Sequence, residues 1–453
     1  MSSNRSSFTG KIGFVLAAAG SAVGLGNIWR FPYLAAKYGG GIFLLVYIAL
    51  SVTFGFSLMV AEIAIGRKTQ LSPMGAYRAL DKRFTFVGVL GAVIPAIILP
   101  YYSVIGGWVM KYAYGFISGD ALNMADDSYF GGFITNTFEP LFWFALFIGI
   151  TSIIVLFGVE KGIEKVSKVM MPVLVALILF IARFTICTVD GAWDGVVYYI
   201  KPDFSRFSIM TVVAAMGQLF YSMSLAMGIM ITFGSYMKKD ISIEKSAKQI
   251  ELFDTGIAFL AGLMIIPAVY AFSGGDPEAL GKGPSLMFGA LPKIFANMPV
   301  GTVIGVIFFI MVFLAALTSS ISLMETVVST VQDKFRIGRK VSCLVVLGIS
   351  LLLGIPSSLG YSVWGEFKIL GLQMLDFFDF ASNNILMPIV AFATCIFIGY
   401  VLKPKAIIDE VELEGNHLKH KKVFNIMIKY IAPICILIIL VSSVLDVFGI
   451  VKI

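Results

Sequence analysis

The sequence is dominated by eleven apolar stretches, and most of them are long enough to cross a bilayer as helices. A helix needs about 20 residues to span roughly 30 Å of hydrocarbon. The stretches are residues 11–36, 41–66, 86–117, 140–158, 166–188, 209–236, 252–273, 299–329, 341–356, 373–402 and 424–447. The ninth is short, and we expect Pro356 to end it.

The small number of charged residues also indicates a membrane protein. Only 13% of the residues are charged, against about a quarter in soluble domains, which is too few to solvate a globule of this size. Lys and Arg gather in every second connection, whereas residues 118–139 contain none. Because basic residues favour the cytoplasmic side, we predict an all-α polytopic protein of the cell membrane, with a cytoplasmic N-terminus and the C-terminus outside. This bias explains the net charge of +7 without a nucleic-acid partner.

The first stretch is poorly suited to a continuous helix. Gly20, Gly24 and Gly26 fall within seven residues, and each weakens a helix by about 1 kcal/mol relative to alanine. Asn27 and Arg30 follow at once and place polar groups near the middle of the membrane. Close packing through small residues is one explanation. We favour a functional break, because charge inside a membrane is rare and usually functional.

The sixth stretch contains a second interruption. Ser222, Ser224 and Gly228 lie within its central residues 218–228. Paired interruptions in the first helix of each half of a chain indicate the binding site of a transporter. Unwound backbone there exposes carbonyl groups to cations, and the helix N-termini attract a carboxylate.

Together these motifs resemble the neurotransmitter:sodium symporter family, which has the LeuT-type fold. The matching segments are residues 20–33, Glu62 with 66–67, 101–102, 218–228, 234–236, 315–320 and 379–380, in family order and spacing. The resemblance is to the bacterial amino-acid members with eleven spans. It implies an N-terminal segment 1–10, inverted five-helix repeats 11–188 and 209–402 with broken helices 1 and 6, a cytoplasmic loop 403–423, and an eleventh helix 424–447. A monomer is expected to suffice for function.

The resemblance implies two sodium ions. Site 2 would use the carbonyls of Gly20, Val23 and Ala315 and the hydroxyls of Thr318 and Ser319. The simpler alternative is that these hydroxyls bond back to their own helix.

Site 1 would use Ala22, Asn27, Ser222 and Asp254. Asp254 stands where many relatives have Asn, and Ala258 stands where chloride-dependent animal members have Ser. We infer that Asp254 supplies the negative charge, so that chloride is dispensable. The alternative is an ordinary aspartate at the membrane edge.

The implied substrate is a hydrophobic or aromatic L-amino acid. Its pocket would comprise Ala22, Leu25, Gly26, Ile98, Tyr102, Tyr221, Ser224, Met227, Ser319 and Leu323. Gly24 favours a free amino acid, because monoamine carriers have an aspartate there. Ala226 departs from the glycine of many bacterial relatives, which leaves the preferred side-chain size open.

The resemblance also implies gates and a hinge. Arg30 and Asp379 would pair at the outside with Gln218 beside them, and Tyr102 and Tyr221 would form an aromatic lid. Arg5 and Asp333 would pair at the inside near Tyr236, where Phe8 replaces the usual tryptophan. Gly162 and Pro172 match a hinge motif in the fifth helix, although an ordinary proline kink is the alternative.

The sequence therefore predicts a sodium-coupled, chloride-independent symporter that imports hydrophobic L-amino acids by alternating access. A sensor that binds without accumulation, a channel, and proton coupling are the alternatives. An enzyme is disfavoured because the scattered cysteines and two loop histidines form no catalytic or zinc-binding pattern.

Overall fold

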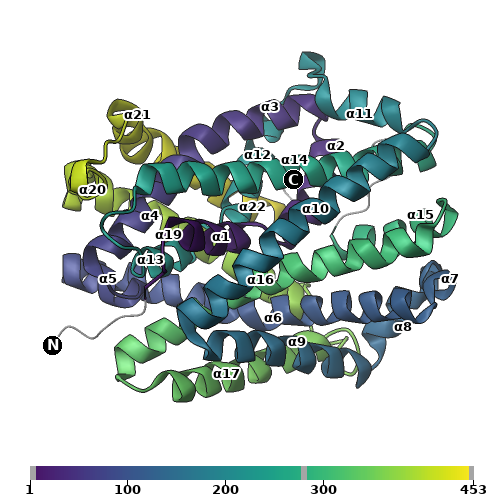
Figure 1. The fold of residues 1–453 in the computed structure, drawn as a ribbon, viewed down its shortest axis with the longest axis horizontal. Helices are drawn as coiled ribbons and strands as arrows, with labels where there is room; N and C mark the ends of the chain where they lie inside the picture. The colour runs from purple at the N-terminus through teal and green to yellow at the C-terminus, as the bar shows by residue number, and fades with distance from the viewer. Residues whose placement is uncertain (1–6, 277–282, 448–453) are drawn as a thin grey trace.

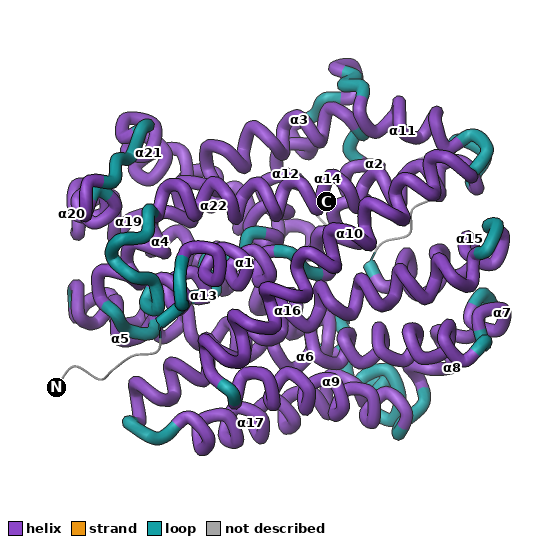
Figure 2. Tube along the Cα trace, in the orientation of Figure 1, coloured by secondary structure: helices purple, strands orange, loops and turns teal. Residues whose placement is uncertain are grey.

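The computed structural model describes residues 7–276 and 283–447, and these residues form a bundle of helices. Within these ranges the only β-type pairings are isolated bridges, Gly40 with Pro202 and Ile369 with Leu372. In Figure 1 most helices run along the long axis of the molecule. Figure 2 shows that most loops lie at its two ends. The predicted all-α class is therefore confirmed.

The α-helices are connected in several places by short π-helical segments. The α-helices are α1 Lys11–Ala22, α2 Phe31–Lys37, α3 Gly41–Leu50, α4 Phe56–Thr69, α5 Pro73–Leu80, α6 Thr85–Ser118, α7 Ala121–Met124, α8 Asp127–Thr135, α9 Glu139–Leu156, α10 Lys165–Thr188, α11 Ala192–Ile200, α12 Ile209–Ser222, α13 Ile229–Gly234, α14 Ile243–Phe272, α15 Leu291–Asn297, α16 Gly301–Phe335, α17 Arg339–Leu359, α18 Met374–Asp379, α19 Met387–Ile396, α20 Pro404–Val411, α21 Lys421–Ile426 and α22 Ala432–Val447. The π-helical segments include η1 Gly26–Arg30, η2 Ser51–Gly55, η4 Val159–Glu164, η8 Phe380–Leu386, η9 Phe397–Leu402 and η11 Met427–Ile431.

The described residues account for all eleven predicted spans. Nine continuous helices are long and apolar enough to cross a membrane, and a tenth span is the pair Lys11–Ala22 and Gly26–Lys37, bent by 55°. The sixth predicted span, 209–236, corresponds to α12 and α13, which are separated by residues 223–228. Both expected interruptions are therefore present in the backbone.

One predicted boundary is wrong. Pro356 does not end the ninth span, because α17 continues to Leu359 with Pro356 inside it. A proline removes only its own N–H donor. The carbonyl of Pro356 still accepts a hydrogen bond from the backbone N–H of Gly360 at 2.9 Å, so the last turn remains closed.

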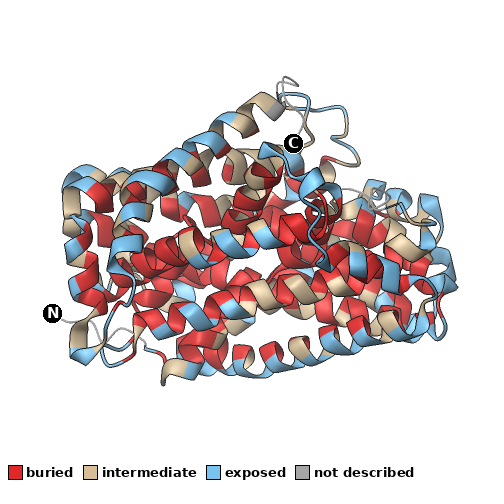
Figure 3. Ribbon diagram, turned by 90° about the horizontal axis from the view of Figure 1, so that it is seen from above, coloured by how far each residue is buried: buried red, intermediate tan, exposed pale blue. Residues whose placement is uncertain are grey.

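The buried interior is surrounded by an apolar exterior. Figure 3 shows buried residues along the centre of the bundle and exposed residues around its outside. Many exposed side chains are large and apolar, for example Leu252 at 73% and Leu352 at 72% exposure. Such a surface suits lipid, which solvates apolar side chains without cost.

Glycines allow the short helix α13 to lie backbone to backbone against α4. A Cβ atom on Gly66 would lie 2.0 Å from the carbonyl oxygen of Ile231, and one on Gly234 would lie 2.4 Å from that of Ile63. Small residues at such crossings are the usual basis of close packing in membranes. This contact holds α13, the second half of the broken sixth span, against α4.

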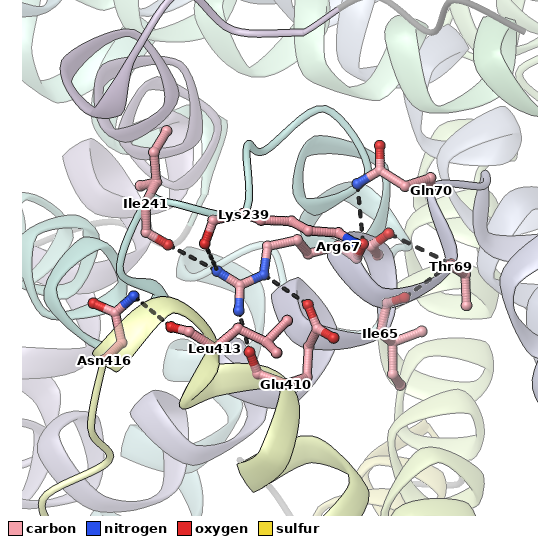
Figure 4. Close-up of polar contacts among 10 residues, drawn as sticks. Ile65, Arg67, Thr69, Gln70, Lys239, Ile241, Glu410, Leu413 and Asn416 are labelled. Atoms are coloured by element: carbon pink, nitrogen blue, oxygen red, sulfur yellow. Dashed lines mark hydrogen bonds and ion pairs between the residues drawn. The ribbon is translucent and has the colours of Figure 1, made fainter. Parts of the chain in front are cut away.

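The same end of α4 is attached to α20 by a buried arginine, shown in Figure 4. Arg67 is fully buried, and its Nε atom lies 2.8 Å from Oε1 of Glu410. Its Nη1 atom donates to the carbonyl of Ile241 at 2.8 Å, and Nη2 donates to the carbonyl of Glu410. In Figure 1, α5, α20 and α21 lie at the end of the bundle nearest the N-terminus, opposite α7, α8 and α15.

Candidate functional site

A small cavity lies where the two broken spans meet. Its volume is about 40 Å³, and all ten residues of the predicted substrate site line it. The remaining lining residues are Ser21, Gly24, Asn27, Ser222 and Ile229. Since none of the lining side chains is charged, a charged side chain of a ligand would have no counter-ion at the cavity wall.

The break in the sixth span has an unusual backbone. Ser224 and Ala226 have φ angles of 52° and 60°, and Gly228 has a φ of 70°. This left-handed region is unfavourable for residues with a Cβ atom. Oε1 of Glu62 accepts a hydrogen bond from the N–H of Ala226 at 2.7 Å, so Glu62 binds the unwound segment.

Two predicted ligands of site 1, Asn27 and Ser222, contact the buried carboxylate of a third, Asp254. Oδ1 of Asp254 accepts hydrogen bonds from the Asn27 amide at 2.7 Å and from the Ser222 hydroxyl at 2.5 Å. Oδ2 accepts one from the Tyr47 hydroxyl at 3.2 Å. Asp254 is fully buried.

The predicted ligands of site 2 also lie together. The Ser319 hydroxyl lies 3.5 Å from the carbonyl oxygen of Gly20 and 3.2 Å from those of Ser21 and Val23. Thr318 instead bonds the carbonyls of Leu314 and Ala315 in its own helix, at 3.1 and 3.0 Å. The back-bonding alternative therefore applies to Thr318 and not to Ser319.

Both clusters fit a hard cation. Their donor atoms are carbonyl, hydroxyl, amide and carboxylate oxygens, the ligand type that hard cations prefer. A cation would replace hydrogen bonds that these groups now make to one another. The carboxylate of Asp254 gives site 1 a formal negative charge, whereas the predicted ligands of site 2 are neutral.

A second and larger cavity of about 480 Å³ lies beside the first, and Tyr221 lines both. Arg30 and Asp379 both line the larger cavity, but the expected ion pair between them is not formed in the described part of the chain. The Arg30 guanidinium lies 5.2 Å from the centre of the Tyr221 ring. Asp379 accepts hydrogen bonds from Tyr101 at 3.0 Å and Asn383 at 2.7 Å, so the two charges have other neighbours in this conformation.

Gln218, expected beside the outer pair, contacts the first break instead. Its side-chain amide donates to the carbonyl of Gly26 at 3.0 Å. This bond links α12 of the sixth span to η1 of the first. Tyr102, expected in the lid, accepts a hydrogen bond from the N–H of Leu25 at 3.4 Å.

The opposite side of the site is closed by aromatic packing. Phe8 is fully buried, and its ring contacts those of Phe14, Phe233 and Tyr236 with centroids 5.6 to 6.2 Å apart. The Tyr236 hydroxyl donates to Oε1 of Glu325 at 2.7 Å. The smaller ring of Phe8 therefore still fills its position.

Only one residue of the ion pair expected at the inner gate lies within the described ranges. Asp333 accepts a hydrogen bond from the backbone N–H of Ser72 at 2.7 Å. Its expected partner Arg5 lies outside the described residues. Glu325, which the sequence analysis missed, forms an ion pair with Arg339 at 2.5 Å.

The predicted hinge is helical in this conformation. Gly162 lies in η4 and Pro172 lies within α10. A Cβ atom on Gly162 would lie 2.2 Å from the carbonyl oxygen of Ile154, so this glycine also allows a close backbone approach.

Sequence reasoning missed Tyr47, Ser21 and Ile229. Tyr47 lies in the second span. Its hydroxyl could have indicated a buried polar contact, because a lone polar group within an apolar stretch needs a hydrogen-bond partner. Ser21 contacts Ser224, whose hydroxyl donates a hydrogen bond to the carbonyl of Ser21 at 3.0 Å. Ile229 carried no chemical signal.

Comparison with known proteins identifies the family. The model of the sodium:neurotransmitter symporter family matches residues 5–128 and 133–450. The chain belongs to this family. An uncharacterized sodium-dependent transporter of Haemophilus influenzae is 33% identical over 458 residues, covering 97% of this chain and 98% of the relative. YhdH of Bacillus subtilis, also an uncharacterized sodium-dependent transporter, is 34% identical, with 96% of each chain covered.

A transporter from an animal and a solved structure extend the comparison. The sodium- and chloride-dependent taurine transporter of Rattus norvegicus is 26% identical, covering 90% of this chain and 73% of the relative. The crystal structure of MhsT in complex with L-phenylalanine superposes with a TM-score of 0.87 at 38% identity, covering 97% of this chain and all of that one. The protein is therefore a multi-pass membrane transporter with the LeuT-type fold, and its transport is coupled to sodium.

Proposed function

We propose that this symporter imports hydrophobic or aromatic L-amino acids together with two sodium ions, across the cell membrane and by alternating access. The observation that carries the proposal is the cavity at the two breaks, which combines an uncharged wall with adjacent clusters of oxygen atoms. The L-phenylalanine bound to the similar MhsT supports the substrate class.

The two ends of an amino acid find complementary groups in the broken spans. The backbone N–H of Leu25 and the Tyr102 hydroxyl suit the carboxylate, together with a sodium ion at Asp254. The carbonyl of Ser21 and the hydroxyl of Ser224 suit the ammonium group. Ile98, Met227 and Leu323 surround the side chain, and a thioether such as Met227 adapts to different shapes.

The asymmetry of the two sides supports alternating access. The larger cavity opens beyond Tyr221, while Phe8 and Tyr236 fill the other side. Closing the larger cavity would bring Arg30 and Asp379 together above the substrate. Opening the other side would require the aromatic packing of Phe8 to separate. Since one chain forms the whole cavity, a monomer is sufficient.

Uptake into proteoliposomes tests the proposal. We expect radiolabelled L-phenylalanine to accumulate with an inward sodium gradient and not when potassium replaces sodium. Glutamate and lysine should not compete, because no charged side chain lines the cavity. Saturable sodium-dependent binding without accumulation under any gradient would instead indicate a sensor.

Chloride dependence gives a separate prediction. Asp254 supplies a buried negative charge at site 1, so uptake should be unchanged when gluconate replaces chloride. The Asp254→Asn variant should lose sodium affinity by about tenfold or more, since hydrogen bonds and contacts to a charged group are worth about 1.5–3 kcal/mol. Initial rates of uptake as a function of sodium concentration measure both effects. A collapse of wild-type uptake in gluconate contradicts chloride independence.

A further inference from the structure

A buried carboxylate joins the N-terminal segment to the start of the fifth span. Glu164 is the last residue of η4, two positions after Gly162, and it is 1% exposed. Its Oε2 atom accepts a hydrogen bond from the backbone N–H of Thr9 at 2.9 Å, and its Oε1 atom accepts one from the Thr9 hydroxyl. One side chain therefore binds both donors of a residue that lies 155 positions away.

Two lysines complete this contact. Nζ of Lys168, one turn further along the fifth span, lies 2.6 Å from Oε1 of Glu164 and 3.4 Å from the Thr9 hydroxyl oxygen. Nζ of Lys238, which follows α13, donates to the carbonyl of Thr9 at 3.1 Å. Hydrogen bonds that involve a charged group are roughly twice as strong as neutral ones. The backbone and the hydroxyl of Thr9 are thus held by charged groups from two other parts of the chain.

Thr9 directly follows Phe8, the residue whose ring fills the closed side of the site. The backbone N–H of Phe8 donates to the carbonyl of Tyr236 at 3.1 Å. Gly13, in the first turn of α1, leaves room for the carboxylate, since a Cβ atom there would lie 2.1 Å from Oε1 of Glu164. The Glu164 side chain therefore lies between the fifth span, the segment that carries Phe8 and the start of α1.

We propose that Glu164 is a positioning residue of the transport cycle, a latch whose carboxylate must release Thr9 before the side filled by Phe8 can open. This inference rests on the proposed function. Glu164 lies between Gly162 and Pro172, so unwinding of this segment would move the carboxylate away from Thr9. Unwinding of the fifth span and departure of the Phe8 ring are then one coupled movement.

Hydrogen–deuterium exchange of the purified full chain in detergent, without sodium, tests the latch. Glu164→Gln keeps the size of the side chain and removes its charge. Because hydrogen bonds to a charged group shift an equilibrium by about tenfold or more, we expect exchange to accelerate by about tenfold at Phe8 and across residues 165–171 together. The Phe8 amide bonds the carbonyl of Tyr236 and not Glu164, so a purely local loss at Thr9 would leave it unchanged. Amides of α17 should exchange as in wild type.

Two further variants complete the experiment. Glu160→Gln is the matched control, since Glu160 is an exposed carboxylate of the same segment η4, and it should exchange like wild type. Thr9→Val removes the hydroxyl that Oε1 of Glu164 accepts from. Variants that break one shared contact are not additive. The double variant should therefore accelerate exchange by less than the product of the two single effects.

The outcomes separate this inference from the proposed function. Wild-type proteoliposomes without sodium-dependent uptake of L-phenylalanine would refute both. Wild-type uptake combined with an acceleration that is confined to Thr9, or that spreads equally over the whole chain, would overturn the latch alone. If Glu164→Gln fails to fold, Thr9→Val provides the test at an exposed position, and unchanged exchange across residues 165–171 overturns the inference.

Discussion

Gly26 lies at a point of the site where no side chain fits. A Cβ atom there would lie 2.5 Å from two carbons of the Tyr221 ring. Gly26→Ala should therefore displace the ring that separates the two cavities and weaken sodium-dependent L-phenylalanine binding by about tenfold, or 1.4 kcal/mol. A binding isotherm measures the change. Gly149→Ala is the control because a Cβ atom at Gly149 meets nothing within 4 Å, and equal affinities for the two variants would contradict the prediction.

Glu62 supports the strained segment of the sixth span through one backbone bond. Glu62→Ala leaves the buried N–H of Ala226 without its acceptor, at a cost of about 1–3 kcal/mol. Glu62→Gln keeps an oxygen acceptor and should lose less stability than Glu62→Ala. Thermal unfolding in detergent measures the stabilities. We expect wild type to be the most stable, Glu62→Gln to be intermediate and Glu62→Ala to be the least stable. Glu160→Ala, at an exposed position, should unfold like wild type, and an Ala variant as stable as this control would refute the assigned role.

At the scale of elements, Arg67 joins α4, α20 and the loop before α14. Arg67→Met leaves the Glu410 carboxylate buried without a cation, which should cost about 3–5 kcal/mol. Adding Glu410→Leu should recover part of that loss, because the unpaired charge is then gone. Thermal unfolding of both variants measures this, with the exposed Lys68→Met as control. A double variant no more stable than Arg67→Met would show that lost packing, not charge, dominates.

At the scale of the whole molecule, we propose that the start of the fifth span is the hinge of alternating access. Gly162 is a poor site for a test, since a side chain there meets the backbone of Ile154. Pro172→Ala adds an N–H donor and should stabilise the closed helix by up to about 3 kcal/mol. The turnover rate of sodium-driven uptake should fall several-fold while equilibrium binding is kept. Pro356→Ala, the same change in α17, is the control and should leave the turnover rate unchanged. A wild-type turnover rate for Pro172→Ala would contradict the hinge and favour an ordinary proline kink.

The sequence by itself determined the spans, the two breaks and the oxygen-rich residue types beside them. These features are local: the length of an apolar stretch, closely spaced glycines and lone hydroxyls act within one helix. One local prediction from the sequence was wrong: Pro356 does not end its helix. A proline near the end of a helix removes one hydrogen-bond donor without ending the helix.

Only the tertiary structure decided which polar atoms meet. Tyr47 reaches Asp254, Arg67 reaches Glu410 and Tyr236 reaches Glu325 across 207, 343 and 89 positions of sequence. Such contacts depend on the rotation and axial position of packed helices, which the pattern of a single segment does not specify. In the proposed cycle of alternating access, the pairing of Arg30 with Asp379 depends in addition on which side of the transporter is open.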